Sequence, residues 1–389
     1  MAERAGHRRL LFISNGHGED SIAAAIIRRL PEGFEADAFP TIGDGLAYRG
    51  VCEVVGPRAH LASQGWRNVK GSLLRDIADG GLLTILPALR FGREARQRYD
   101  RAIVVGDIVG VAGCFLLGVR DILYIDVYKT GYGRLYSAIE RFLISRTART
   151  TFCRSERLAA QLRAAGCDAR CAGNVMMDCL PRGVYNANLR RHRYLAVTLL
   201  PGSRQFTTEN FARQVEALSL VTPQKRPDLF LALADNVPLE VLAEAGGLTV
   251  RPPASAEPGD AGTLVGGGLT IHVARGATGN LIEAADFVLS QAGTATVQAL
   301  GLGKPVVTFI DRRDRPSRIA DENALFGEAR VLVPADPERI AEATEKLLDN
   351  SLERRRLGAI GRERIGGPGA MDAIIEAIVC GDAAGAPAR

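Results

Sequence analysis

Four loops combine glycines with hydroxyl, amide and carboxyl groups in ways that suit chemistry on a bound ligand. The first, Ser14–Asp20, reads Ser-Asn-Gly-His-Gly-Glu-Asp. Its two glycines allow a tight turn and a close backbone approach, and His17 could act as a general base or bind an acceptor. The simpler alternative is that Asp20 or Ser21 only caps a following helix. The residues predicted to contact an acceptor are Asn15, Gly16, Gly18 and Glu19.

The second loop places the carboxylate of Asp107 directly after an apolar run, Arg101–Val105. A carboxylate at the carboxyl end of a strand faces the crevice in which α/β proteins bind their ligands. It could take a proton from an attacking hydroxyl while a sugar leaves its nucleotide. We therefore predict Asp107 and His17 as catalytic residues. The alternative for Asp107 is the N-cap of a helix that begins near Val109.

The third and fourth loops suit a diphosphate. The third, Leu199–Arg204, contains an arginine that can pair with a diphosphate, although alone it could be an ordinary Pro-Gly turn. The fourth, Ser290–Gln298, is a turn of small residues that opens a helix, so its amides and hydroxyls can hold phosphates and Gln298 can reach a ribose. The predicted donor-binding residues are Gly202, Ser203, Arg204, Gln291, Gly293, Thr294, Ala295, Thr296 and Gln298.

Each of these loops follows a predicted strand in a pattern of alternating apolar and amphipathic runs. The four strands are Arg9–Ser14, Arg101–Val105, Tyr194–Leu200 and Phe287–Ser290. This alternation is typical of a parallel sheet with helices on both faces, which binds ligands at the carboxyl ends of its strands. The stretch Gly246–Gly268 is rich in glycine and proline and is interpreted as loops.

The pattern occurs twice, so we predict two Rossmann-like domains. Residues 1–180 form the N-terminal, acceptor-binding domain, and residues 181–193 form a polar, basic linker. Residues 194–365 form the C-terminal, nucleotide-sugar-binding domain, and the remaining segment, 366–389, contains a terminal helix.

Composition narrows the class of protein. The chain has 389 residues and a net charge of +5, which fits anionic substrates or an anionic membrane surface. No basic run is interleaved with aromatic residues, so nucleic acid is not an expected partner. The seven cysteines form no zinc pattern and are interpreted as reduced thiols of a cytoplasmic protein. We find neither a signal peptide nor an apolar run long enough to span a membrane.

Residues 65–91 could contact a membrane surface. The stretch contains the chain's one tryptophan, Trp66, and mixes apolar residues with arginine and lysine. Such a mixture suits an interfacial element that docks on anionic lipid. The alternative is a pair of helices that packs on the sheet.

Three motifs together resemble the lipid-A-disaccharide synthase family, and more closely a related, less characterised branch of it. They are Leu199–Arg204, the stretch Gly293–Pro305, and Gly173–Asp178, which is similar to a Gly-His-x-Met-x-Asp stretch of the family. Their order and spacing agree with the family over most of the chain.

The resemblance implies the GT-B fold, in which two facing Rossmann-like domains enclose a cleft and the terminal helix crosses back to the N-terminal domain. It implies an inverting hexosyltransferase of lipid biosynthesis that needs no metal and no cofactor. The donor would be a UDP-sugar bound by the C-terminal domain, and the acceptor would be lipid-linked. Asp107 aligns with the family's proposed catalytic carboxylate. The expected location is the cytoplasm, with peripheral contact to the inner face of the cytoplasmic membrane through residues 65–91.

Some residues depart from the family pattern and leave alternatives open. The first loop differs from the family's Gly-Glu-x-Ser-Gly-Asp, so the acceptor could differ. Gln298 replaces a glutamate, which leaves the base of the nucleotide open. The arginines of Asp311–Arg318 could contact the donor diphosphate; they are Arg312, Arg313, Arg315 and Arg318. A UDP-sugar epimerase of the same fold and a non-catalytic nucleotide-sugar-binding relative are the alternative functions.

Overall fold

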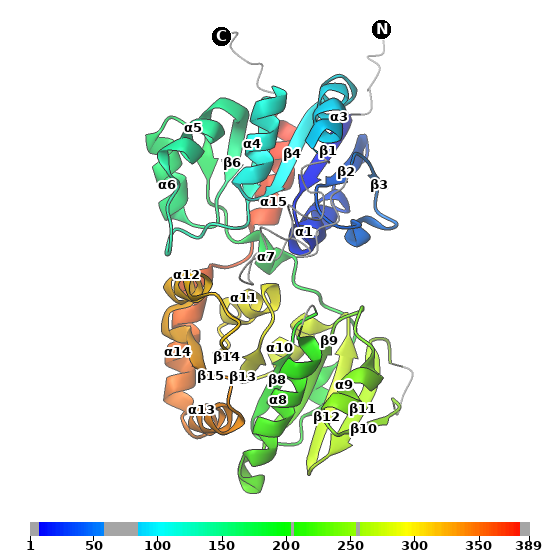
Figure 1. The fold of residues 1–389 in the computed structure, drawn as a ribbon, viewed down its shortest axis with the longest axis vertical. Coiled ribbons are helices and arrows are strands. Elements are labelled where there is room, and N and C mark those ends of the chain that lie inside the picture. The colour runs from blue at the N-terminus through cyan, green and yellow to red at the C-terminus, as the bar shows by residue number, and fades with distance from the viewer. Residues whose placement is uncertain (1–7, 58–84, 204–205, 254–256, 382–389) are drawn as a thin grey trace. The chain divides into compact units, whose positions relative to one another are not determined.

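The computed structural model describes residues 8–57, 85–203, 206–253 and 257–381. The chain divides into two compact units, each built on one sheet (Figure 1). Unit 1 comprises Met1–Cys179, Arg315–Asp321 and Pro368–Arg389. Unit 2 comprises Leu180–Asp314 and Glu322–Gly367.

Unit 1 contains a parallel sheet in the order β3-β2-β1-β4-β5-β6-β7. Its central strands are continuous apolar runs because both faces are covered. The chain runs outward in opposite directions from β1 and β4, so the topological switch point lies between these two strands. The strands are β1 (Arg8–Ser14), β2 (Phe34–Pro40), β3 (Glu53–Val54), β4 (Arg101–Gly106), β5 (Ile122–Asp126), β6 (Ala148–Phe152) and β7 (Ala169–Arg170).

Successive residues of β4 belong to two different hydrophobic cores, because successive side chains of a strand point to opposite faces of the sheet. Ile103 and Val105 pack with α1 and with the terminal helix α15, whereas Ala102 and Val104 pack with α4, α5 and α6. Unit 1 therefore includes a helix from the far end of the chain, α15. The helices of this unit are α1 (His17–Ile27), η1 (Leu46–Tyr48), α3 (Ile85–Arg98), α4 (Ile108–Leu117), α5 (Ala138–Thr147), α6 (Glu156–Ala164), α7 (Val175–Asp178) and α15 (Ala370–Cys380).

Unit 2 contains a sheet in the order β10-β11-β12-β9-β8-β13-β14-β15. All neighbouring pairs in the part β12-β9-β8-β13-β14-β15 are parallel. The topological switch point lies between β8 and β13. The strands are β8 (Ala196–Leu200), β9 (Asp228–Leu233), β10 (Thr249–Arg251), β11 (Asp260–Gly266), β12 (Leu269–Arg275), β13 (Phe287–Ser290), β14 (Val306–Ile310) and β15 (Arg330–Pro334).

The prediction that Gly246–Gly268 forms only loops is wrong. Strands β10 and β11 form an antiparallel extension of the sheet with β12. Gly267 and Gly268 both have positive φ, 57° and 71°, and make the two-residue turn between β11 and β12. Two consecutive glycines of this kind suit the hairpin turn that matches strand twist. The apolar pattern of β11 is short and has glycines within and beside it, so the sequence did not indicate a strand there.

The helices of unit 2 cover both faces of its sheet. They are η2 (Ala187–Arg190), α8 (Thr207–Leu220), η3 (Pro223–Lys225), α9 (Leu239–Ala245), α10 (Thr278–Ala284), α11 (Thr294–Gly301), α12 (Pro316–Phe326), η4 (Gly327–Ala329), α13 (Pro337–Asp349) and α14 (Ser351–Ile365). The first part of α12 belongs to unit 1 and its last part to unit 2. The stretch 181–193, predicted as a linker, packs on unit 2: Tyr185 is buried, and Arg190 forms ion pairs with Glu257 and Asp260.

Candidate active site

The first and second loops meet at the switch point of unit 1. Strands β1 and β4 are neighbours, and Asn15 and Asp107 directly follow their last residues. The Asn15 Nδ2 donates a hydrogen bond of 2.6 Å to Asp107 Oδ1. Gly106, which directly precedes Asp107, has a φ of 154°, and a Cβ at this position would lie 2.2 Å from Asn15 Oδ1. Only glycine allows the two side chains to approach in this way.

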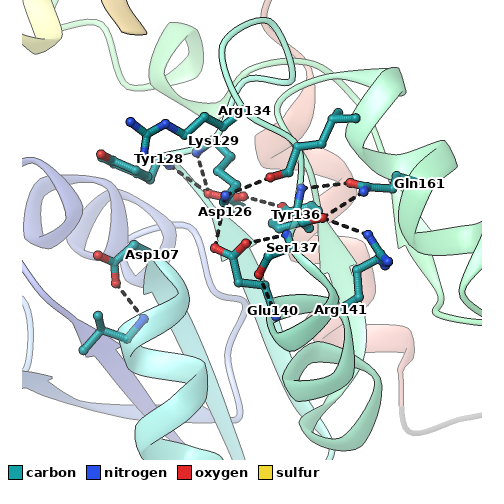
Figure 2. Close-up of polar contacts among 12 residues, drawn as sticks. Asp107, Asp126, Tyr128, Lys129, Arg134, Tyr136, Ser137, Glu140, Arg141 and Gln161 are labelled. Carbon is teal, nitrogen blue, oxygen red and sulfur yellow. Dashed lines mark hydrogen bonds and ion pairs between the residues drawn. The ribbon is translucent and has the colours of Figure 1, made fainter. Parts of the chain in front are cut away.

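Asp107 is also the N-cap of α4. Its Oδ1 accepts a second hydrogen bond, of 2.8 Å, from the backbone N–H of Val109, as Figure 2 shows. The N-cap alternative is therefore realised. It does not exclude a catalytic role, because both of these bonds fall on one oxygen of the carboxylate.

The rest of the first loop forms the start of α1. Gly16 is the N-cap, and the backbone of His17 and Gly18 begins the first turn, while the His17 side chain lies outside the described part. A Cβ on Gly16 would lie 2.5 Å from Glu19 Oε2, so the Glu19 carboxylate lies against the loop.

Asp20 is buried beneath this loop. Its Oδ1 accepts a hydrogen bond of 2.6 Å from the Ser14 hydroxyl, which lies 2.7 Å from the Tyr48 hydroxyl. Burial raises the pKa of Asp20 to about 7, and the charge of Glu19 adds to the effect. Asp20 therefore belongs to a buried polar cluster of unit 1.

The third and fourth loops lie side by side in unit 2. Their strands pair in parallel with Leu200 opposite Ser290, and Gln291 N–H donates to the Leu200 carbonyl at 2.8 Å. Gly202 has a φ of 103°, and a Cβ there would lie 3.7 Å from the Gln291 carbonyl oxygen. The two predicted donor-binding loops thus form one continuous edge at the switch point.

The helices that follow these loops begin without side-chain caps. Phe206 precedes α8 and Gly293 precedes α11, and neither makes a side-chain hydrogen bond to the first turn. Gly293 and Thr294 are exposed, whereas the Thr296 hydroxyl lies 2.6 Å from that of Ser290 inside the turn. The first-turn amides of a helix carry partial positive charge, which suits an anionic ligand group.

The other predicted donor-binding residues have mixed environments. Ser203 is exposed, Ala295 is half-buried, and Arg204 lies outside the described residues. Gln291 Nε2 donates to the Phe309 carbonyl at 2.6 Å, which fixes the side chain against β14. Gln298 is only 3% exposed, so its side chain is buried where α11 packs against the rest of the unit.

The basic stretch after β14 is bonded to the start of α8, which follows the third loop. Arg313 pairs with Asp311 and Glu209 at 2.6 and 2.9 Å, and stacks over the Phe206 ring at 4.0 Å. The hydrogen bonds and the positive charge of Arg313 hold the pKa of Asp311 below its usual range. Arg313 therefore links the loop after β14 to the first turn of α8 through Asp311 and Glu209, while Arg312 is exposed.

Sequence reasoning missed a buried carboxylate beside the Asp107 loop. Asp126 ends β5 opposite Gly106 and is 1% exposed. Its Oδ1 accepts from the backbone N–H groups of Tyr128 and Lys129 at 2.9 and 3.0 Å, and its Oδ2 accepts from the Tyr136 hydroxyl (Figure 2). Burial raises the pKa of Asp126. The signal that indicated Asp107, a carboxylate at the end of an apolar strand, is present here too.

Asp126 anchors the loop between β5 and α5. The Lys129 ammonium pairs with Glu140 at 3.1 Å and donates to the Leu135 carbonyl at 3.0 Å. Ser137 and Glu140 form a capping box at the start of α5. The loop that carries Tyr128 is therefore fixed at both ends.

Neither a metal site nor a membrane span is found among the described residues. No group of three or more His, Cys, Asp or Glu side chains there is arranged to hold a metal ion. No helix in the same part of the chain is both long enough and apolar enough to cross a membrane. All seven cysteines are free thiols.

No protein-family model and no curated protein matches the sequence, but solved structures match its fold. CalG4, the calicheamicin glycosyltransferase, is 16% identical with a TM-score of 0.57, covering 97% of this chain and 100% of its own. MnaA of S. aureus, solved with UDP, is 15% identical with a TM-score of 0.56, covering 95% and 96%. A UDP-N-acetylglucosamine 2-epimerase is 14% identical with a TM-score of 0.54, covering 98% and 99%. The chain has the GT-B fold of these proteins, which confirms the predicted α/β fold class.

Proposed function

We propose that the chain is an inverting, metal-independent glycosyltransferase that moves a sugar from a UDP-sugar to a hydroxyl of a lipid-linked acceptor. The observation that carries the proposal is the position of the candidate residues at the switch points of both sheets. Asn15 and Asp107 share a hydrogen bond at one, and the loops after β8 and β13 are joined at the other. These are the places where open α/β sheets bind ligands.

In this proposal unit 2 binds the diphosphate. The α11 amides that follow Gly293 stabilise the negative charge that grows on the diphosphate as the sugar leaves. Arg204, which lies outside the described residues, is the cation predicted to pair with the diphosphate. MnaA, a protein of this fold, was solved with UDP, which supports the choice of a uridine nucleotide.

Asp107 is the proposed general base. Its carboxylate takes the proton of the acceptor hydroxyl, the hydroxyl oxygen forms a bond to the anomeric carbon, and the bond from that carbon to the diphosphate breaks. A single displacement of this kind inverts the anomeric configuration. Asn15 holds Oδ1 by its hydrogen bond and so orients the carboxylate. His17 is a second candidate for the proton.

The lipid-linked acceptor and the hexosyl donor rest on the resemblance to the lipid-A-disaccharide synthase family. The same resemblance supports the absence of a metal and of a cofactor, and a peripheral position on the cytoplasmic membrane. Of the predicted membrane segment 65–91, residues 65–84 lie outside the described residues, and the remainder begins α3.

An isosteric substitution tests the base. Because both hydrogen bonds fall on Oδ1, Asp107→Asn can keep them and remain a good N-cap while the basic carboxylate is lost. We expect UDP release from UDP-N-acetylglucosamine, measured with a detergent-solubilised lipid extract of the source cells, to fall about 10²–10⁴-fold. Asp372→Asn, on the exposed face of α15, is the matched control. Unchanged turnover in Asp107→Asn would remove the assignment.

A UDP-sugar epimerase is the second candidate, and the fold of the epimerase described above favours it. An epimerase converts the UDP-sugar alone, whereas a transferase needs the acceptor. Proton NMR of UDP-N-acetylglucosamine incubated with the protein but without lipid extract separates the two. Appearance of the 2-epimer under these conditions would overturn the transferase proposal.

A further inference from the structure

Helix α4 of unit 1 is apolar along its whole length but only partly covered. Its ten residues read Ile-Val-Gly-Val-Ala-Gly-Cys-Phe-Leu-Leu, without one polar side chain. Val111 and Cys114 are its buried residues, whereas Val109 is 50% and Leu116 is 76% exposed. Positions seven apart lie on one stripe of a helix, so these two side chains belong to the same open face.

Helix α5 continues this apolar surface. Phe115 of α4 and Phe142 of α5 meet edge to face with ring centroids 5.9 Å apart, which joins the two helices. On α5, Ile139 is 72% and Phe142 is 51% exposed. Ile139 and Phe142 are three positions apart and therefore share one side of the helix. We call the surface formed by Val109, Phe115, Leu116, Ile139 and Phe142 the α4–α5 face.

Two arginines border the α4–α5 face. Arg120 lies 4.7 Å from the centre of the Phe115 ring, and Arg146 lies 5.6 Å from that of Phe142. From Ile108 to Arg149 the sequence has six arginines and lysines against three acidic residues, of which Asp126 is buried. Nearby, the loop anchored by Asp126 exposes Tyr128.

We propose that the α4–α5 face docks on an anionic phospholipid bilayer. Exposed aliphatic and aromatic side chains enter the boundary between headgroups and acyl chains, and the bordering arginines pair with lipid phosphates. A second copy of the chain fits less well, because a symmetric contact would bring two like-charged rims together. The inference rests on the proposed function in one respect: a lipid-linked acceptor would be reached from this surface.

Vesicle co-sedimentation tests the surface. We expect the protein to bind vesicles of phosphatidylglycerol mixed with phosphatidylcholine, and to bind phosphatidylcholine alone more weakly. Ile139→Glu with Phe142→Glu should lower the partition coefficient at least about tenfold, because two inserted apolar groups are lost. Leu352→Glu, in α14 of unit 2, is the matched control, since Leu352 is 72% exposed like Ile139. It should bind as the wild type does.

Three results would overturn the proposal. The first is a wild type that binds neither kind of vesicle, and the second is a double variant that binds vesicles as well as Leu352→Glu does. The third is a wild type that binds no vesicles but forms a dimer in light scattering, where the double variant is a monomer. Thermal unfolding of the whole protein like that of the wild type shows that the double variant is folded, and stabilisation by UDP-N-acetylglucosamine reports the donor site of unit 2. The UDP-sugar measurement also separates the two proposals. A wild type that binds UDP-N-acetylglucosamine but no vesicles contradicts only membrane docking. A wild type that binds vesicles but not UDP-N-acetylglucosamine contradicts only the proposed donor site.

Discussion

Asp20 shows how burial can change the chemistry of a carboxyl group. It lies at the base of the glycine-rich loop, with one oxygen bonded to Ser14. Its pKa is raised from 3.8 to about 7, chiefly by burial. Between these two values the folded state holds a proton that the unfolded state has lost. The free energy of unfolding therefore falls as the pH rises through this interval, by about 4 kcal/mol at most.

Asp20→Asn should remove this dependence because an amide cannot ionise. We expect the melting temperature of the variant, relative to that of the wild type, to rise between about pH 4 and pH 7 and to level off above that range. Thermal unfolding of both proteins across the pH range measures the difference. A difference that stays constant with pH would show that Asp20 does not carry a raised pKa.

The two carboxylates at the ends of β4 and β5 show the limits of sequence reasoning at single residues. Asp107 directly follows an apolar strand and Asp126 ends one, but only Asp107 was predicted as a site residue. In the structure Asp107 is half-buried, with one oxygen bonded, whereas Asp126 is enclosed and bonded through both oxygens. The difference depends on Tyr136, ten residues further along the chain, which no local pattern indicates.

At the scale of elements, strong apolar patterns could be predicted and weak ones could not. Strand β13 matches the predicted bounds and strands β1 and β4 differ from them by one residue, because each is a continuous run bordered by clear turn residues. Strands β10 and β11 were missed because their stability comes from pairing with β12, a contact distant from their own composition. Helix α12 was missed because its sequence is polar and follows a run of arginines.

The loop between β5 and α5 depends on the bond between Tyr136 and Asp126. Tyr136→Phe removes the hydroxyl and leaves a buried carboxyl oxygen without this donor, which should cost about 1–3 kcal/mol of stability. Tyr194→Phe is the control, because Tyr194 is almost fully exposed and should change stability little. Urea unfolding, followed by fluorescence, measures both. Equal midpoints for the two variants would mean that this bond does not hold the loop.

At the scale of the whole molecule, the same arrangement occurs in both units. Each sheet has its switch point between two central strands, and at each point the loops after those strands contact one another. The sequence predicted these loops because glycines and polar residues directly follow apolar runs. The N-cap position of Asp107 was among the predicted alternatives and is realised, whereas the burial of Gln298 could not be predicted because it depends on the packing around α11.

The central claim is that the turn before α11 binds the diphosphate of a nucleotide sugar, and Gly293→Asp tests it most directly. A Cβ at Gly293 would meet nothing within 4 Å, so the fold should tolerate the change, but a carboxylate would occupy the place of the phosphate. Gly367→Asp, equally exposed and equally unobstructed, is the control.

The measurement is the thermal shift caused by UDP-N-acetylglucosamine. At about a hundred times its dissociation constant, the ligand should stabilise the wild type and Gly367→Asp by roughly 2.7 kcal/mol. Gly293→Asp should show almost no shift. Equal shifts in all three proteins would place the nucleotide elsewhere, and no shift in the wild type would contradict the account.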